Sequence, residues 1–344
     1  MTKPAVASPS RRVLGWTAAF ALLLAIPLPP ASGRAPVERL EVSSRPIAQF
    51  RIGRDQKDFG SLEFVGGLEM VSRGRHFGAL SSFRFLTPGA DFIGVADTGF
   101  WFFGKVVRDE ARRPVGITDF SMQSMVDDKG NAIDEKWSVD AEGLDVKGGI
   151  ATVGFERNHR VAQFRIDRDD MKAPFRELDF LVPKRELRQN KGFETAVHAA
   201  ADGPLKGSLV VVSERSIDTQ GNVFAAVLEG PRKGVFTVKR TDDFDITDGA
   251  FLPNGDLLLL ERRFTFTDGV AMRLRRIDGE TIRAGGLADG PVLLSADMGY
   301  QIDNMEGLDV WRRDDGALMV SLVSDDNHSM LQRNLYLEFR LHED

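Results

Sequence analysis

The chain has 344 residues, of which 42% are hydrophobic and 28% are charged, a composition typical of a soluble globular protein. It contains no cysteine, which excludes disulfide bonds, thiolate metal sites and a cysteine nucleophile and leaves oxygen and nitrogen groups for any chemistry. Its 51 acidic and 45 basic residues give a net charge of -6, so we expect no nucleic-acid partner, which would favour a basic protein.

Residues 1–35 are typical of a cleaved export signal. Arg11 and Arg12 precede an apolar run over residues 13–26, and small residues suited to a peptidase follow at 31–33. The run is shorter than the roughly 20 apolar residues needed to span a bilayer, so we expect no integral membrane segment after the signal is removed. The arginine pair resembles a twin-arginine signal, with an ordinary Sec leader as the alternative. Either route predicts a periplasmic protein.

Residues 36–344 are predicted to form one all-β domain. Segments of strand length, most of them rich in β-branched or aromatic residues, follow one another along this part of the chain. They lie at 92–96, 150–155, 161–166, 209–213, 223–228, 235–239, 257–260, 272–277, 318–323 and 335–341. Turn signals such as Asp278-Gly279 separate the segments, and the best helical candidate, at 183–191, is short.

A weak internal repeat points to one all-β architecture. The sequence Asp-Ala-Glu-Gly-Leu-Asp-Val at 140–146 recurs as Asn-Met-Glu-Gly-Leu-Asp-Val at 304–310, and degenerate copies contain Glu194 and Asp248. A unit of about 50 residues with four short strands is the size of a propeller blade, whereas a β-sandwich or jelly roll explains no such repeat. We predict a single β-propeller of six blades, with five to seven compatible with the repeat, closed by pairing residues 37–50 with the C-terminal strand.

The repeat also predicts carboxylates gathered at one end of the propeller axis. The acidic members of the four copies are Glu142, Glu194, Asp248 and Glu306. A second acidic set follows one strand later and comprises Glu156, Glu214, Glu261 and Asp325, with Asp97 from an earlier copy. Crowded carboxylates repel one another unless cations neutralise them. Calcium, which takes about six to eight oxygen ligands, suits the first set as metal ligands.

Basic residues beside the second set offer another interpretation. Arg157, Arg215 and Arg262 each directly follow a carboxylate of that set. Glu-Arg ladders between blades would neutralise the acidic charge without any function. Turned into the channel instead, the three guanidinium groups would bind an anionic group of a substrate.

Two histidines occur at matching offsets from acidic residues. His159 lies three residues after Glu156, and His328 lies three residues after Asp325. The match favours a role in the channel, with Glu156 and His159 as candidate acid–base groups and His328 as a candidate substrate contact. Ordinary turn histidines are the alternative.

Taken together, these motifs resemble the phytase-like family of bacterial exported proteins, named for an esterase-like activity of phytase. The resemblance rests on the Glu-Gly-Leu-Asp repeats, the stretch 153–160, the segment 212–215 and the run 248–257, and it covers roughly residues 59–341. It implies a propeller and the hydrolysis of phosphate or carboxylic esters with metal dependence. It assigns no residue a catalytic role.

Three functions therefore stand open from the sequence. The first, which we favour, is a periplasmic, monomeric hydrolase of a small anionic or ester substrate with Ca²⁺ as its cofactor. The second is a non-catalytic propeller that binds a ligand or a protein. The third is a lactonase-type propeller, which also uses carboxylates and one calcium ion in the channel.

Overall fold

The computed structural model describes residues 1–2, 36–133, 136–188 and 191–343. The predicted signal segment therefore lies almost entirely outside the described residues. Contacts divide the chain into two units, residues 1–31 and 32–344, and every strand below belongs to the second. Among the described residues, no helix is long and apolar enough to cross a membrane.

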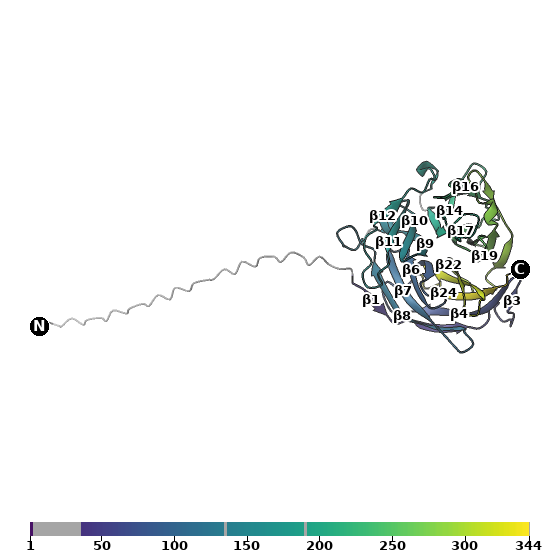
Figure 1. The fold of residues 1–344 in the computed structure, drawn as a ribbon. Helices are drawn as coiled ribbons and strands as arrows, with labels where there is room; N and C mark the ends of the chain where they lie inside the picture. Colours follow the sequence, from purple (N-terminus) through teal and green to yellow (C-terminus); the bar gives the residue numbers. More distant parts are fainter. Residues whose placement is uncertain (3–35, 134–135, 189–190, 344) are drawn as a thin grey trace. The chain divides into compact units, whose positions relative to one another are not determined.

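The described residues form five sheets arranged around one axis as the blades of a β-propeller (Figure 1). From the innermost strand outward, blade 1 consists of β5 (Leu80–Phe85), β6 (Asp91–Ala96), β7 (Phe100–Arg108), β8 (Pro114–Ser124) and β1 (Glu38–Leu40). Blade 2 consists of β9 (Ala141–Lys147), β10 (Ile150–Phe155), β11 (Arg160–Arg165) and β12 (Arg176–Leu178). Blade 3 consists of β13 (Phe193–His198), β14 (Leu209–Ile217), β15 (Val223–Val227), β16 (Gly234–Val238) and β20 (Leu287–Ala288).

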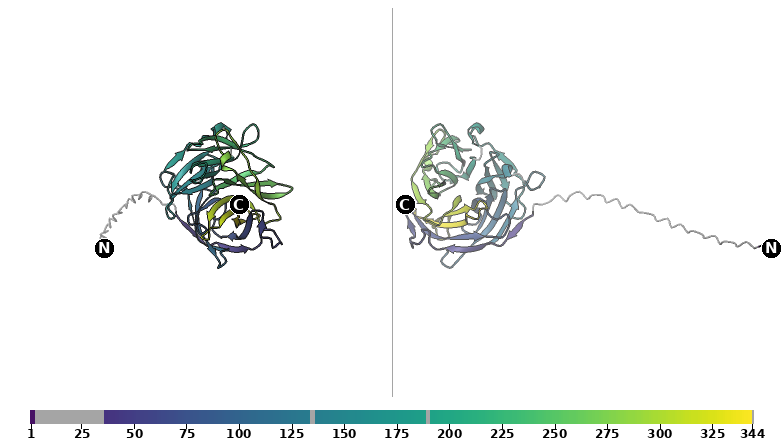
Figure 2. Two further views of the ribbon diagram at one scale, coloured as in Figure 1. Left: turned by 45° about the vertical axis from the view of Figure 1, so that its right-hand side comes forward. Right: turned by 180° about the vertical axis from the view of Figure 1, so that it is seen from behind.

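Blades 4 and 5 complete the ring, and Figure 2 shows it from two further directions. Blade 4 consists of β17 (Asp245–Phe251), β18 (Leu257–Thr265), β19 (Gly269–Ile277) and β21 (Val292–Ala296). Blade 5 consists of β22 (Asn304–Arg312), β23 (Leu318–Asp325), β24 (Asn334–Leu341), β4 (Leu62–Val71) and β2 (Ser43–Ile47), with β3 (Asp58–Phe59) paired to β4. The described helices are single short turns at α1 (Lys136–Val139), η1 (Lys184–Glu186) and η2 (Gly279–Thr281).

The predicted propeller is confirmed, and the described residues give it five blades, within the expected range and one fewer than the number favoured. The N-terminal strands form no blade of their own, because β1 joins blade 1 while β2, β3 and β4 join blade 5. The ring closes where β4 pairs with β24, from Met70 opposite Asn334 to Leu62 opposite Leu341. Closure joins the two ends of the domain in one sheet.

The closing strand is therefore β4 and not the segment 37–50 that the sequence suggested. Part of that segment forms β2, which pairs with the far edge of β4. Strand β2 contains Pro46 and buries only Ile47, whereas most residues of the ten-residue β4 are buried or half-buried. A short strand with a proline suits the sheet edge, where one N–H is not needed.

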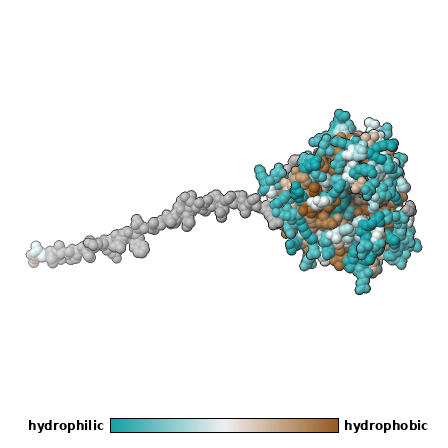
Figure 3. All heavy atoms as spheres, in the orientation of Figure 1, coloured by the Kyte–Doolittle hydropathy of each residue, from teal (hydrophilic) through white to brown (hydrophobic). Residues whose placement is uncertain are grey.

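Apolar side chains fill the spaces between neighbouring blades. Five buried hydrophobic clusters occupy these interfaces, and the one between blades 4 and 5 contains Leu258 and Leu308. In Figure 3, hydrophilic side chains cover most of the visible face, with apolar ones between them. The innermost strands β5, β9, β13, β17 and β22 contact one another in that order around the axis. Packing between blades thus holds the innermost strands in place, and these strands carry the candidate site.

Candidate functional site

Each innermost strand contains one extra residue near its start, relative to the strand it pairs with. The pairing register shifts by one residue there in all five blades, as it does at a β-bulge. The extra residues are Ser81, Glu142, Glu194, Thr247 and Glu306. A bulge redirects a side chain out of the regular ladder, and the five positions are equivalent around the axis. Three of them carry a predicted metal ligand.

Asp248 occupies a different position from the other three predicted ligands. It follows the bulge residue Thr247 by one, and successive side chains of a strand point to opposite faces. Its fully buried carboxylate accepts hydrogen bonds from Nη1 and Nη2 of Arg84, both at 2.8 Å, and from the hydroxyl of Ser82 at 2.8 Å. Because Arg84 already neutralises this carboxylate, Asp248 does not belong to the ligand set that we propose for a metal ion.

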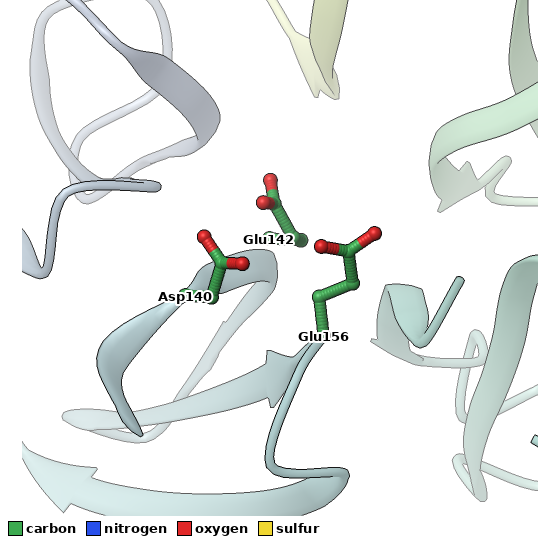
Figure 4. A group of neighbouring side chains, drawn as sticks. All are labelled: Asp140, Glu142 and Glu156. Carbon is green, nitrogen blue, oxygen red and sulfur yellow. The ribbon is translucent and has the colours of Figure 1, made fainter. Parts of the chain in front are cut away.

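The remaining carboxylates form two overlapping groups at one end of the axis. Ligand oxygens of Asp140, Glu142 and Glu156 lie within 4.8 Å of one another. The same holds for Glu156, Glu194 and Glu214, so Glu156 belongs to both groups. Figure 4 shows the first group, in which the three carboxylates extend from blade 2 and lie close together. We call these five residues the carboxylate centre.

Basic side chains neutralise part of the carboxylate centre. Lys191 Nζ lies 2.6 Å from Glu214, and Arg157 Nε lies 2.7 Å from Asp140. Arg262 Nη2 lies 3.9 Å from Glu214 as well. These contacts correspond to the Glu-Arg ladder that the sequence offered as an alternative, although only for two of the five carboxylates.

Three carboxylates of the centre, those of Glu142, Glu156 and Glu194, form no ion pair with a basic side chain among the described residues. Glu142 and Glu194 form no hydrogen bond or ion pair with any residue that the structure describes, and Glu194 is only 5% exposed. Both lie among other acidic groups, which repel them. A buried carboxylate without a basic partner is stable only when a cation from outside the chain neutralises it or when it takes up a proton.

The pKa values show this conflict. Burial raises the pKa of Glu156 to about 8, and the charges of Asp140 and Glu214 add to the effect. Burial also raises the pKa of Glu142 and of Glu194 well above the ordinary value, with further contributions from their acidic neighbours. Burial and mutual repulsion thus oppose the charged form of these carboxyl groups, and a bound divalent cation would favour it.

Glu306 lies beside the centre and is connected to it by Arg262, which also contacts Glu214. Arg262 Nη2 lies 3.3 Å from Glu306 Oε1, and the amide of Asn304 donates to the same oxygen at 2.8 Å. Burial raises the pKa of Glu306 to about 8 in spite of this guanidinium. Arg262 Nε is buried and has no acceptor among the described residues. This N–H is thus an unsatisfied buried donor beside the carboxylate centre.

The other predicted basic site residues are spread around the centre. Arg215 pairs with Asp245 at 3.3 Å, and His159 is half-buried, with burial lowering its pKa. His328 lies on an exposed turn, where its backbone has a φ of 48–49° together with Asn327. The structure thus brings Arg157 and Arg262 to the carboxylate centre, and it brings His328 to neither carboxylate group.

In the rest of the second acidic set, Glu261 has basic partners, whereas Asp325 forms no ion pair among the described residues. Glu261 is buried between Arg273 and Arg275, which both bond to its carboxylate. Burial raises the pKa of Asp325 to about 7, and the charges of Asp97 and Asp326 raise it further. Glu261 is thus neutralised by blade 4 itself, whereas Asp325 extends the acidic surroundings of Glu306.

Sequence reasoning missed two members of this site, Asp140 and Lys191. Asp140 opens the copy of the repeat that contains Glu142, so its position was visible, but its counterpart in the last copy is Asn304. Lys191 precedes β13 and reaches Glu214 on the neighbouring strand β14. No repeated pattern marks this lysine.

A propeller with buried, partly unpaired carboxylates at one end of its axis is the class of protein that this geometry defines. A family model described as phytase-like, with esterase-like activity of phytase, matches residues 75–328. This match covers most of the chain, and the protein belongs to the phytase-like family.

Solved structures similar to this chain are propellers and enzymes of several kinds. The PQQ-bound aldose sugar dehydrogenase of Streptomyces coelicolor is 13% identical, with 83% of this chain and 99% of that chain covered and a TM-score of 0.44. Glutaminyl cyclase of Myxococcus xanthus is 12% identical, with 90% and 100% covered and a TM-score of 0.40. No curated protein matches the sequence. These identities are too low to transfer an activity.

Proposed function

We propose that this protein is an exported hydrolase of phosphate or carboxylic esters whose carboxylate centre binds a divalent cation, most suitably Ca²⁺. The family description supports the reaction class. The donor set supports the ion, because Ca²⁺ prefers several carboxylate oxygens and the chain offers no thiolate.

The observation that carries the proposal is the set of three carboxylates without a basic partner, Glu142, Glu156 and Glu194. A purely structural Glu-Arg ladder would give every carboxylate a basic partner. Instead, each of the two overlapping groups contains two acidic residues without such a partner among the described residues: Glu142 and Glu156 in the first, Glu156 and Glu194 in the second. A cation bound at each group, or one shared through Glu156, would neutralise the charge that the chain leaves uncompensated.

The residues around the centre suit an anionic or ester substrate. When bound, Ca²⁺ polarises an ester oxygen and lowers the pKa of a coordinated water molecule. The partly exposed guanidinium group of Arg262 and the ammonium group of Lys191 would attract the anionic part of the substrate. Glu156 orients water as a carboxylate common to both groups, and His159 lies three residues further along the chain as a second proton carrier.

Calcium titration of the purified chain from residue 36 onward tests the proposal. We expect calorimetric Ca²⁺ binding, turnover of an aryl phosphate or an aryl ester, and loss of both after chelation. Glu194→Gln should weaken Ca²⁺ binding about tenfold or more, because it removes a charged ligand. Glu229→Gln, on an exposed turn, is the matched control. Absence of both binding and turnover would refute the proposal.

A non-catalytic binding propeller is the second candidate function. The ion pairs of Glu214 with Lys191 and of Asp140 with Arg157 favour it, because they neutralise carboxylates without substrate. It predicts Ca²⁺ binding that raises thermal stability, with no turnover of either aryl substrate.

Export to the periplasm is part of the same proposal and is supported by the sequence alone. Replacing Arg11 and Arg12 by lysine should abolish export if the twin-arginine route is used, and should leave export through the Sec route largely intact. Fractionation of cells that express the full chain measures this directly.

A further inference from the structure

A cavity lies at the opposite end of the propeller axis from the carboxylate centre. It has a volume of about 350 Å³, and all five innermost strands contribute to its wall. Strand β22 contains both Glu306, which lies beside the carboxylate centre, and Asp309, which lines this cavity. The two residues are three positions apart, which corresponds to about 10 Å along a strand. A cavity of this size fits a small organic molecule.

Asp309 brings a buried carboxylate without an ion-pair partner among the described residues to the cavity. It is 8% exposed, and its two oxygens accept hydrogen bonds from the backbone N–H groups of Phe85 at 2.8 Å and Val310 at 2.9 Å. It forms no ion pair with any residue in the described part of the chain. Backbone N–H groups stabilise a carboxylate without cancelling its charge.

The two arginines of the cavity wall are already paired elsewhere. Arg84 bonds Asp248 through both terminal nitrogens at 2.8 Å. Arg312 pairs with Glu343 in the same bidentate way at 2.9 Å. The charge of Arg84 favours the ionised form of Asp309, but both guanidinium groups are bonded to other carboxylates and neither forms an ion pair with Asp309, so the cavity favours a cationic ligand.

His198 adds an unused acceptor to the same wall. Its Nδ1 lies 2.5 Å from Oδ2 of Asp145. Because a carboxylate oxygen can only accept a hydrogen bond, Nδ1 is the donor and carries the proton. In the neutral ring Nε2 is then an acceptor, and it has no hydrogen-bond partner among the described residues. Asp145 and His198 come from neighbouring blades, so the pair is fixed by the packing of β9 against β13.

The rest of the wall is apolar and partly aromatic. Phe85, Phe251 and Trp311 line it together with aliphatic side chains. Aromatic faces attract cations and pack against hydrocarbon. Asp145 is a third metal-ligating side chain in this wall, but ligand atoms of Asp145, His198 and Asp309 do not all lie within 4.8 Å of one another, which favours an organic cation over a metal ion.

We propose that this cavity binds a small organic cation, with a primary ammonium group held by Asp309 and His198 and an apolar body held by the aromatic wall. The ammonium group donates to Asp309 and to Nε2 of His198, and its charge compensates the buried carboxylate. This site is separate from the carboxylate centre, and it stands whether or not the protein hydrolyses esters.

Benzylamine and benzyl alcohol, titrated calorimetrically into the purified chain from residue 36 onward, test the proposal. The two probes share an apolar body and differ in charge. We expect benzylamine to bind about tenfold or more tightly than benzyl alcohol, because a charge-assisted bond to a buried carboxylate is lost with the alcohol. Equal affinities, or no binding of benzylamine, would overturn the proposal.

Substitutions locate the bound amine. Asp309→Asn should weaken benzylamine binding about tenfold or more, whereas Asp202→Asn, which makes the same charge change on an exposed turn, should not alter it. If Asp309→Asn does not fold, His198→Ala gives the same test with a smaller expected loss. Saturating Ca²⁺ should leave benzylamine binding intact. Displacement by Ca²⁺, or full affinity in both cavity variants, would place the amine elsewhere and overturn the proposal.

Discussion

Removing the guanidinium group of Arg84 should destabilise the propeller more than any surface change. Arg84 is 4% exposed and Asp248 is fully buried, and their bidentate pair joins β5 of blade 1 to β17 of blade 4. Arg84 Nη2 also donates to the carbonyl of Gly249 at 2.9 Å. The Asp248 carboxylate accepts the backbone N–H of Leu308 on β22 at 2.9 Å. The pair thus holds three of the five innermost strands together.

The expected cost follows from what Arg84→Met leaves behind. The methionine fills much of the volume, but Asp248 remains buried without its cation, and removing one partner of a buried ion pair costs about 3–5 kcal/mol. A domain has only about 5–15 kcal/mol of stability in total. Replacing both partners, as in Arg84→Met with Asp248→Leu, removes the uncompensated charge, so the double variant should be more stable than Arg84→Met alone.

Urea unfolding at pH 7 with chelator, followed by tryptophan fluorescence, measures these differences. Arg45→Met is the control, because Arg45 forms an exposed ion pair with Glu69 that should contribute about 0–1 kcal/mol. A loss below about 1 kcal/mol for Arg84→Met, no larger than that of the control, would refute the reasoning. So would a double variant that is no more stable than the single one.

Two further predictions concern the carboxylate centre and its surroundings. Burial raises the pKa of Glu306 to about 8 from 4.5, so the folded, metal-free chain holds a proton that the unfolded chain has lost. Its melting temperature in chelator should therefore fall as pH rises from about 4.5 to about 8, and Ca²⁺ should raise it more at pH 8 than at pH 5; a flat profile would contradict this. Gly192→Ala would bring a Cβ within 2.6 Å of the Glu156 backbone, so it should cost about 1–3 kcal/mol in unfolding experiments and weaken Ca²⁺ binding. Gly116→Ala, whose Cβ would meet its nearest atom at 4.0 Å, should do neither.

The fold class was predictable because the repeat is visible in composition and spacing. Each predicted strand segment overlaps a strand of the structure. The number of blades was not predictable, because the N-terminal strands are shared between blades 1 and 5 and because blade 1 carries Ser81 where three other blades carry glutamate. A blade without the acidic residue is hard to count from the repeat.

The site was predictable only as far as equivalent positions carry similar residues. Glu142, Glu194 and Glu306 all occupy the bulge. In blade 4 the bulge residue is Thr247, and the acidic residue Asp248 follows it. Aligning the acidic residues of the four repeats therefore places Asp248 at the bulge, one residue away from its actual position. Nothing in the sequence distinguishes a bulge residue from its neighbour, because the extra residue is defined by pairing with another strand.

The two ends of the axis differ chemically because the same innermost strands present different residues at their starts and at their ends. Carboxylates gather at the bulges, whereas the far end combines Asp309 and His198 with aromatic rings. Arg84 and Asp248 belong to the same innermost layer, and their mutual pairing leaves no charge for either end to neutralise. The two sites share no residue, and Glu306 and Asp309, one beside each site, are three residues or about 10 Å apart on β22. A cation at the bulges and an amine at the far end can therefore bind together, so one propeller can hold two unrelated ligands.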